Sequence, residues 1–335
     1  MWISDKNKTV YYVGRFKEIE GGFCCSWSGS SVIAGFEGNG ISVRLKSTAE
    51  DDAVNVSVDG ETPYVLNLES GKESYVIAEG LSFGKHSLRI EKRIEGKESV
   101  LTFYGFDYMG GIPVKIPEPS NIAIELIGDS ITAGYGNEGS IDKPGFRHAE
   151  ENAAKTYGAL AAKQLGAEAV IIGWSGMGVY RDLGGGSKHL MPELYLRTLS
   201  EENEKWNFNE YIPRAVVVNL GTNDFAGTKD LNTSEFVDTY ISFIREIRAL
   251  YPKTAILCVM GTIIYEPAPY VKIAVEKLNA SGDKNVYYYA FGKNENEPIG
   301  ADGHPSSVTH ARMANELEAQ IRKIWREKSE ITEKG

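Results

Sequence analysis

Residues 122–136 have the sequence IAIELIGDSITAGYG, in which a run of β-forming residues ends at Gly-Asp-Ser and passes directly into a segment that can begin a helix. This order predicts a strand, a tight turn and a serine, Ser130, at the end of a parallel strand, where open α/β sheets place their active sites. Gly128 is expected to allow the sharp turn, and the first N–H groups of the helix can receive a developing oxyanion. Such a short motif also occurs in ordinary strand-to-helix loops, where Asp129 or Ser130 simply caps the helix.

The chain as a whole has the length and composition of an ordinary globular protein. Its 335 residues favour two domains over one large core. Apolar residues make up 42% and charged residues 24%, which is typical of soluble proteins. The formal net charge of −10 opposes binding to nucleic acid or to an anionic membrane surface. The sequence therefore predicts a neutral or cationic substrate and neither a nucleic-acid nor a membrane partner.

Cysteine and histidine spacing gives no sign of a disulfide framework or a metal site. The three cysteines include an adjacent pair that is geometrically unsuited to bridging to itself, and there is no CxxC motif. We therefore expect no metal and no cofactor. Because there is no apolar stretch that resembles a signal peptide or a membrane span, the expected location is cytoplasmic. A secreted protein whose signal has been removed would look the same, so this alternative stays open.

Residues 1–115 have the pattern of an all-β domain. Apolar residues alternate over 41–45 and over 54–58, and Asp59-Gly60 is a strong hairpin signal. This predicts a sandwich or jelly roll without a helix, whose role is either stabilising or carbohydrate-binding. A proline-rich linker is expected over 116–121.

From residue 122 to 335 strands alternate with helical patterns, which predicts an α/β domain with a parallel sheet of about five strands. The expected strands are 122–128, 169–172, 214–220, 255–260 and 286–290. The expected helices are 153–165, one capped by Thr233 or Ser234 and running to 250, 270–279 and 307–326.

Four polar segments that contain glycine follow strands of this predicted sheet. They are Gly128-Asp129-Ser130, Ser175-Gly176, Gly221-Thr222-Asn223-Asp224 and Asp302-Gly303-His304-Pro305. Because the carboxyl ends of parallel strands lie at one edge, these segments are expected to converge. A serine hydroxyl needs a base to become a nucleophile at neutral pH, and an imidazole suits that task. We therefore expect His304 to activate Ser130.

The remaining parts of the motif set supply an oxyanion hole. The backbone N–H groups of Ser130 and Gly176 and the side-chain amide of Asn223 are the expected donors. Together with the nucleophile and base, they provide what acyl transfer requires.

The blocks GDSIT, WSGMG, GTND and DGHPS, in this order, resemble the SGNH or GDSL hydrolase superfamily over residues 122–328. With the all-β region in front and GRF near the start, the chain more narrowly resembles carbohydrate esterase family 2. The resemblance implies a jelly-roll domain followed by a flavodoxin-like three-layer domain. It also implies removal of acetyl groups from polysaccharide or oligosaccharide, such as mannan, glucan or xylan fragments.

Carried over by position, the resemblance places the nucleophile on Ser130, the base on His304 and the oxyanion residues on Gly176 and Asn223. The acid of the superfamily usually stands three residues before the histidine, where this chain has Ala301. Asp302 stands two residues before it, on the same side of an extended segment, and is the candidate third member. Some family members use a backbone carbonyl instead, and both alternatives stay open.

A second departure is Gly303, where family members often carry an aromatic residue that packs against the sugar. Candidate substrate-binding residues elsewhere are Trp174, Tyr135, Tyr180 and Arg181. Each also has a structural interpretation, since aromatic rings with polar tips are usually partly buried and Arg181 can pair with a nearby acid.

Two other functions compete with carbohydrate deacetylation. The same fold serves lipid esterases, lysophospholipases and acyl-thioesterases. No apolar lid segment is evident, and the stretch 137–148 is polar. The other alternative is a carbohydrate-binding protein that has lost activity, against which the complete set of catalytic residues argues.

Overall fold

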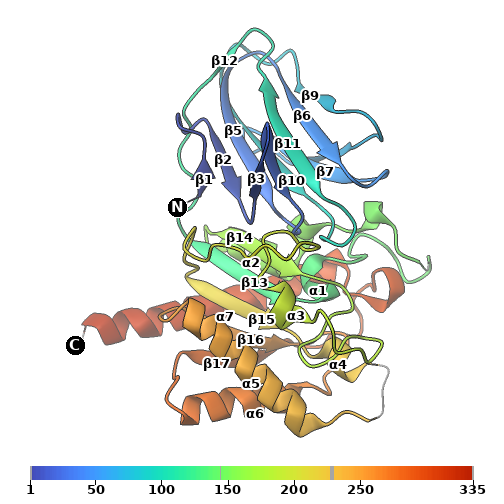
Figure 1. Ribbon diagram of the computed structural model, residues 1–335, viewed down its shortest axis with the longest axis vertical. Helices are drawn as coiled ribbons and strands as arrows, with labels where there is room; N and C mark the ends of the chain where they lie inside the picture. The colour runs from blue at the N-terminus through green and yellow to red at the C-terminus, as the bar shows by residue number, and fades with distance from the viewer. Residues whose placement is uncertain (1, 144, 227–229, 334–335) are drawn as a thin grey trace.

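The computed structural model describes residues 2–143, 145–226 and 230–333. Its N-terminal part is a β-sandwich that stands on the C-terminal α/β part (Figure 1). One antiparallel sheet has the order β1 (Ile3–Ser4), β2 (Val10–Val13), β5 (Ser31–Gly38), β10 (Gly84–Lys92), β7 (Ala53–Val58) and β8 (Tyr64–Asn67), with β12 (Ile112–Pro113) also paired to β5. The other has the order β3 (Lys17–Ile19), β4 (Gly22–Cys25), β11 (Leu101–Asp107), β6 (Ile41–Ser47) and β9 (Ser74–Ala78).

The alternation of apolar residues explains how these two sheets pack. The odd-numbered side chains of β6, Ile41, Val43 and Leu45, are fully buried, as are Val54 and Val56 of β7. They belong to one apolar cluster between the sheets. Burial of alternate side chains along each strand is the expected pattern for a sandwich. The prediction of a jelly-roll-like β domain is confirmed.

The C-terminal part contains a parallel sheet of five strands among the described residues. Its order is β14 (Glu168–Gly173), β13 (Ala123–Gly128), β15 (Ala215–Asn219), β16 (Ala255–Met260) and β17 (Val286–Ala290). Numbered along this part of the chain, the order is 2-1-3-4-5, that of flavodoxin-like folds. The predicted α/β class and strand number are therefore confirmed.

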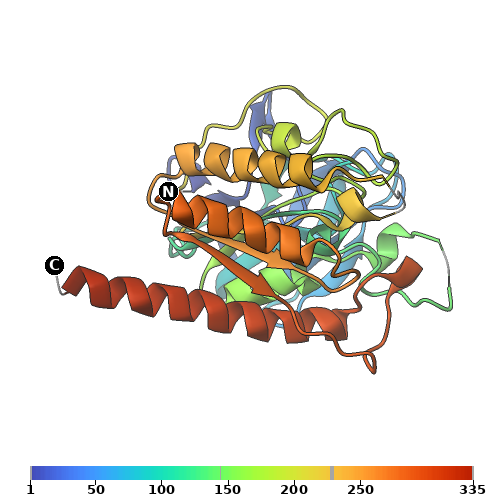
Figure 2. The same cartoon turned by 90° about the horizontal axis from the view of Figure 1, so that it is seen from below.

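Helices cover both faces of this sheet (Figure 2). The helices α2 (Tyr157–Gln164) and α7 (Ser307–Glu333) pack on one face, and α5 (Thr233–Leu250) and α6 (Ala268–Ala280) pack on the other. Short helices lie in the connections: α1 (Ser130–Ala133), α3 (Met191–Leu194), α4 (Thr222–Phe225) and 3₁₀ turns at 148–150, 153–155 and 301–303. Within the described ranges, no helix combines the length and the apolar character needed to cross a bilayer.

Some predicted boundaries need correction. The cap of α5 is Asn232, whose side chain accepts from the Glu235 N–H, rather than Thr233 or Ser234. Asn caps a helix as well as Ser does, so the sequence pattern left several equivalent starts. The last helix continues to Glu333, beyond the expected end at 326.

A buried ion pair joins the two parts of the chain. Arg15 follows β2, and its guanidinium lies 3.8 Å from the carboxylate of Glu125 in the middle of β13, with both side chains fully buried. The same carboxylate accepts hydrogen bonds from the hydroxyls of Tyr195, Tyr211 and Tyr251. These contacts satisfy a charge that would otherwise be costly to bury.

Candidate active site

Ser130 is the first residue of α1, directly after β13. Asp129 caps this helix, accepting from the Ile131 N–H at 3.0 Å. Gly128 is needed for space rather than for a left-handed backbone: a Cβ there would lie 2.1 Å from Thr132 Oγ1 and 2.8 Å from the Asn219 carbonyl oxygen. The strand and the helix therefore pack closely enough to fix the turn that presents the serine.

His304 lies against the serine. Its Nε2 is 2.9 Å from Ser130 Oγ, and its Nδ1 is 3.2 Å from the carbonyl oxygen of Ala301. Burial lowers the pKa of His304 below its ordinary value, although the hydrogen bond to Ala301 acts in the opposite direction. A lowered pKa keeps the imidazole neutral at pH 7, as a general base requires.

The carboxylate of Asp302 is directed to other partners. It accepts from Tyr135 Oη and from the Gly145 N–H, each at 2.9 Å. The hydrogen bonds from Gly145 and Tyr135 lower the pKa of Asp302. Asp302 has a φ of 49° and a ψ of 33°, in the left-handed region, so the segment turns tightly instead of running extended with residues two apart on one side. In this geometry the partner of His304 Nδ1 is the Ala301 carbonyl.

Gly176 and Asn223 follow β14 and β15, the two strands that flank β13. Gly176 lies in the loop that follows β14. Its φ of 85° is a backbone conformation that favours glycine. Its carbonyl accepts from the Leu183 N–H at 2.8 Å. Asn223 lies in α4 with 5% of its surface exposed, and its Nδ2 donates to the Met177 carbonyl at 2.9 Å. The structure thus brings the 174–177 loop and α4 together; participation of Gly176 and Asn223 in an oxyanion hole stays a prediction.

Asp129 also connects the nucleophile turn to this amide. Asn223 Nδ2 lies 3.3 Å from Asp129 Oδ2. Burial raises the pKa of Asp129 to about 7, and repulsion from Asp224 contributes to that increase. Asp129 is therefore placed to order both the turn that carries Ser130 and the side-chain amide of Asn223, which is a structural role.

Two of the predicted substrate-binding residues have internal partners. Trp174 is 9% exposed, and its ring meets Trp27 edge-on with the ring centroids 6.3 Å apart. Arg181 is buried and donates from Nε to the carbonyl of Asp224 at 2.6 Å. The carboxylate of Asp224 accepts N–H groups of residues 179–181. These contacts favour the structural interpretation of both side chains.

The other two predicted residues are tyrosines with different positions. Tyr180 Oη donates to Glu235 at 2.5 Å. Tyr135 lies beside His304, with the two ring centroids 4.4 Å apart. The ring of Phe146 stacks on the Tyr135 ring, with the two ring centroids 4.5 Å apart. Of the four candidates, Tyr135 is the one that the structure places against the base.

Sequence reasoning missed two residues near the site. Phe146 lies in the polar stretch 137–148, where its aromatic character was the one available signal. Glu95 belongs to the N-terminal part, between β10 and β11, and its carboxylate accepts from Ser175, next to Gly176. No sequence pattern links these two distant segments. Within the described part of the chain, no group of three His, Cys, Asp or Glu side chains is arranged to hold a metal ion.

Two family models match the chain. Residues 12–117 match the N-terminal domain of carbohydrate esterase 2, and residues 126–312 match the GDSL-like lipase/acylhydrolase family. The first covers the β-sandwich and the second contains both Ser130 and His304.

Similar proteins are known among curated sequences and solved structures. A cellulase/esterase, CelE, of Acetivibrio thermocellus is 36% identical over 95% of this chain, which spans only 40% of that longer protein. An acetylxylan esterase/glucomannan deacetylase of Cellvibrio japonicus is 26% identical over 88% of this chain and 82% of its own length. The structure of a family two carbohydrate esterase from Clostridium thermocellum, in complex with cellohexaose, has a TM-score of 0.90 at 36% identity and covers 94% of this chain and 98% of its own.

Proposed function

Because this chain belongs to carbohydrate esterase family 2, a family of GDSL-type serine esterases, we propose that it removes acetyl groups from acetylated polysaccharide or oligosaccharide. Mannan, glucan and xylan fragments are the substrates that we favour. The observation that carries the proposal is the 2.9 Å contact between His304 Nε2 and Ser130 Oγ. The names of the Cellvibrio relative and the cellohexaose bound to the Clostridium structure support a β-linked glycan.

The proposed reaction has two halves. His304 Nε2 takes the proton of Ser130 Oγ as this oxygen bonds to the acetyl carbon, and the carbonyl oxygen becomes negative. The N–H groups of Ser130 and Gly176 and the amide of Asn223 stabilise that charge. When the bond to the sugar breaks, the imidazolium gives its proton to the departing hydroxyl and leaves Ser130 acetylated. His304 then deprotonates water as it attacks the acetyl carbon; the bond to Ser130 Oγ breaks, the imidazolium returns its proton to that oxygen, and acetic acid leaves and ionises to acetate.

The acyl group is testable with purified protein. We expect faster acetate release from acetylated mannan or xylan oligosaccharides than from simple acetyl esters, and faster cleavage of acetyl than of octanoyl esters of one alcohol. The physical reason is the polar surroundings of the site, in which Tyr135, Asp302 and Gly145 form a hydrogen-bonded rim. Acetate is measured enzymatically, and the positions freed on the sugar are measured by NMR.

A clear preference for the octanoyl ester would contradict this proposal and indicate a lipid or thioester substrate. Absence of hydrolysis with every ester, together with binding of the oligosaccharides, would indicate a binding protein instead.

Substitution of Asp302 by Asn tests what holds the imidazole. We expect kcat/KM to fall less than about tenfold, because the contact at His304 Nδ1 is made by the Ala301 carbonyl. Removing an acid that holds a catalytic histidine costs about 10⁴-fold in a Ser-His-Asp triad. Tyr135→Phe is the matched control. It removes the hydrogen bond between Tyr135 and Asp302 by deleting the tyrosine hydroxyl, and it keeps both the aromatic ring and the Asp302 carboxylate. A loss near 10⁴-fold in Asp302→Asn alone would make Asp302 the third member of a triad.

A further inference from the structure

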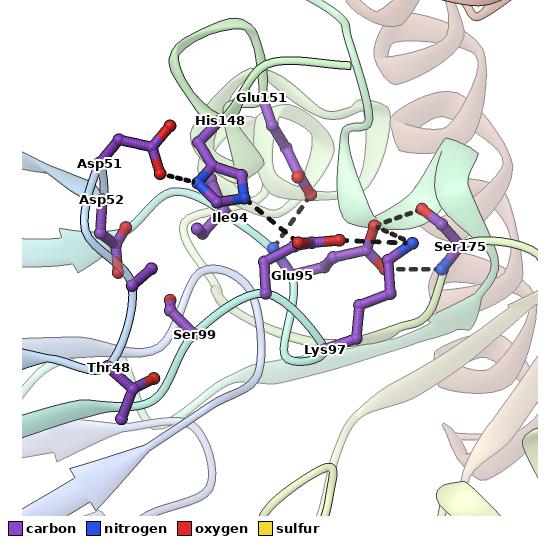
Figure 3. A network of polar contacts seen from close by, with 12 residues as sticks. Thr48, Asp51, Asp52, Ile94, Glu95, Lys97, Ser99, His148, Glu151 and Ser175 are labelled. Carbon is purple, nitrogen blue, oxygen red and sulfur yellow. Dashed lines mark hydrogen bonds and ion pairs between the residues drawn. The ribbon is translucent and has the colours of Figure 1, made fainter. Parts of the chain in front are cut away.

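A loop of the N-terminal sandwich enters the catalytic part of the molecule. Residues 93–100, here called the interdomain loop, connect β10 to β11. Ile94 and Glu95 of this loop have no exposed surface. Figure 3 shows the loop among side chains from both parts, with Glu95 directed towards Ser175. The sandwich is therefore in direct contact with the loop that follows β14.

The carboxylate of Glu95 holds Ser175 at two atoms. Oε2 accepts from the backbone N–H of Ser175 at 2.6 Å, and Oε1 accepts from its hydroxyl at 2.5 Å. Lys97, on the same loop, places its Nζ 3.6 Å from Oε1. A carboxyl group that accepts from both the backbone and the side chain of one residue fixes the orientation of that residue, because hydrogen bonds are directional and two of them leave less freedom than one.

Ser175 immediately precedes Gly176, the predicted oxyanion donor. The peptide unit that joins the two residues carries the Gly176 N–H, so the orientation of Ser175 sets the direction of that donor. On the other side, the Leu183 N–H holds the Gly176 carbonyl at 2.8 Å. The donor is thus restrained from both neighbouring peptide units, and Glu95 supplies one of the restraints.

We propose that Glu95 is a positioning residue for the oxyanion hole, through which the N-terminal domain sets the rate of catalysis. This inference rests on the proposed esterase function and adds to it a residue from outside the hydrolase domain. Glu95 does not touch the substrate; it acts through Ser175 on the Gly176 N–H.

The charge on Glu95 fits this function. A full negative charge near an oxyanion hole would oppose the developing oxyanion, but burial raises the pKa of Glu95, and Lys97 partly offsets that rise. Next to it, Glu151 is also fully buried and accepts from the Glu95 N–H at 3.1 Å. Burial raises the pKa of Glu151 well above its ordinary value, and Glu95 raises it further. In both carboxyl groups, burial therefore shifts the balance towards the protonated form relative to an exposed carboxyl group.

Replacing Glu95 by Ala tests the proposal in the full-length protein. We expect kcat for an acetyl ester to fall about 10- to 100-fold, with KM changed less than about twofold, because a small displacement of a catalytic group has effects of this size. Glu95→Gln keeps an acceptor for the Ser175 N–H and should retain kcat within about threefold. Inhibition by methylboronic acid, which forms a tetrahedral adduct on Ser130, should weaken in Glu95→Ala by about the same factor as kcat.

The link through Ser175 is tested by a double-mutant cycle. Ser175→Ala removes one of the two hydrogen bonds and should lower kcat less than Glu95→Ala does. The double variant should be no slower than Glu95→Ala, since residues that act through one contact are not additive. Additive losses would overturn the proposal.

The matched control is an ion pair that joins the N-terminal and C-terminal parts at a different place. Arg89 on β10 lies 2.9 Å from Glu168 at the beginning of β14, the end of the strand away from Ser175. Glu168→Gln should leave kcat within about twofold of the wild-type value. This control separates loss of an interdomain contact from loss of the oxyanion geometry.

Several results would overturn the inference. They are an unchanged kcat in folded Glu95→Ala, a loss in Glu95→Gln as large as in Glu95→Ala, and boronate affinity that does not follow kcat. If Glu95→Ala does not fold, Glu95→Asp and Ser175→Ala test the inference in its place. Each of these variants should lower kcat at least threefold, and an unchanged kcat in one of them overturns the inference. A wild-type protein without acetyl esterase activity refutes the proposed function, whereas an active wild type with a fully active Glu95 variant refutes this inference alone.

Discussion

Ser130→Ala is expected to lower acetate release by roughly 10⁵- to 10⁶-fold, to a level set by the remaining oxyanion donors and substrate binding. The reason is that Ser130 Oγ lies 2.9 Å from the imidazole and is the proposed nucleophile, which would form the acyl bond. The hydroxyl is small, so binding of acetylated oligosaccharide should remain within about threefold. Acetate release and calorimetric binding on the same preparation measure the two quantities.

The control for this substitution is Ser242→Ala on the exposed face of α5, where the hydroxyl donates to the Asp238 carbonyl of its own helix. This variant should keep full activity. If Ser130→Ala retained more than about 1% of the wild-type kcat, the nucleophile would have to be another residue.

His304→Ala should cause a loss of nearly the same size. In serine hydrolases the base and the nucleophile act as a unit, so the double variant Ser130→Ala/His304→Ala should be no slower than either single variant. In the wild type, burial lowers the pKa of His304 below its ordinary value, so the base becomes protonated only at a lower pH than an exposed histidine does. We therefore expect the acid limb of the wild-type kcat/KM profile to lie below pH 6.5 and to disappear in the variant.

His189→Asn is the control, because His189 is exposed, pairs with Glu193 and has a positive φ that Asn tolerates. It should keep both the rate and the acid limb. An acid limb that persisted in His304→Ala would show that another group titrates in the reaction.

The sequence predicted the parts of the site that depend on strand ends. Ser130, Gly176 and Asn223 each follow a run of buried residues, and such runs were recognisable as parallel strands whose ends share one edge. The order of the sheet and the position of His304 beside Ser130 agree with that reasoning. A local pattern was sufficient because each of these residues is placed by the strand that precedes it.

The remaining features depend on how distant segments pack. The contacts of Asp302 and of His304 Nδ1 depend on the tight turn at 301–303, in which the Asp302 carboxylate accepts from Tyr135 and the Ala301 carbonyl lies against Nδ1. The contact of Glu95 with Ser175 joins residues 80 positions apart and belonging to different domains. A spacing rule within one segment carries no information about either contact.

The ion pair between Arg15 and Glu125 has a consequence for how such a protein can be recombined. Its two members belong to different domains, and both are fully buried. A catalytic domain joined to a different sandwich would keep the Glu125 carboxylate in the middle of β13 without the guanidinium that faces it. Breaking a buried pair in this way costs about 3–5 kcal/mol. Replacement of the sandwich by one without this arginine is therefore expected to destabilise the catalytic domain, so the two domains have to be exchanged as a pair.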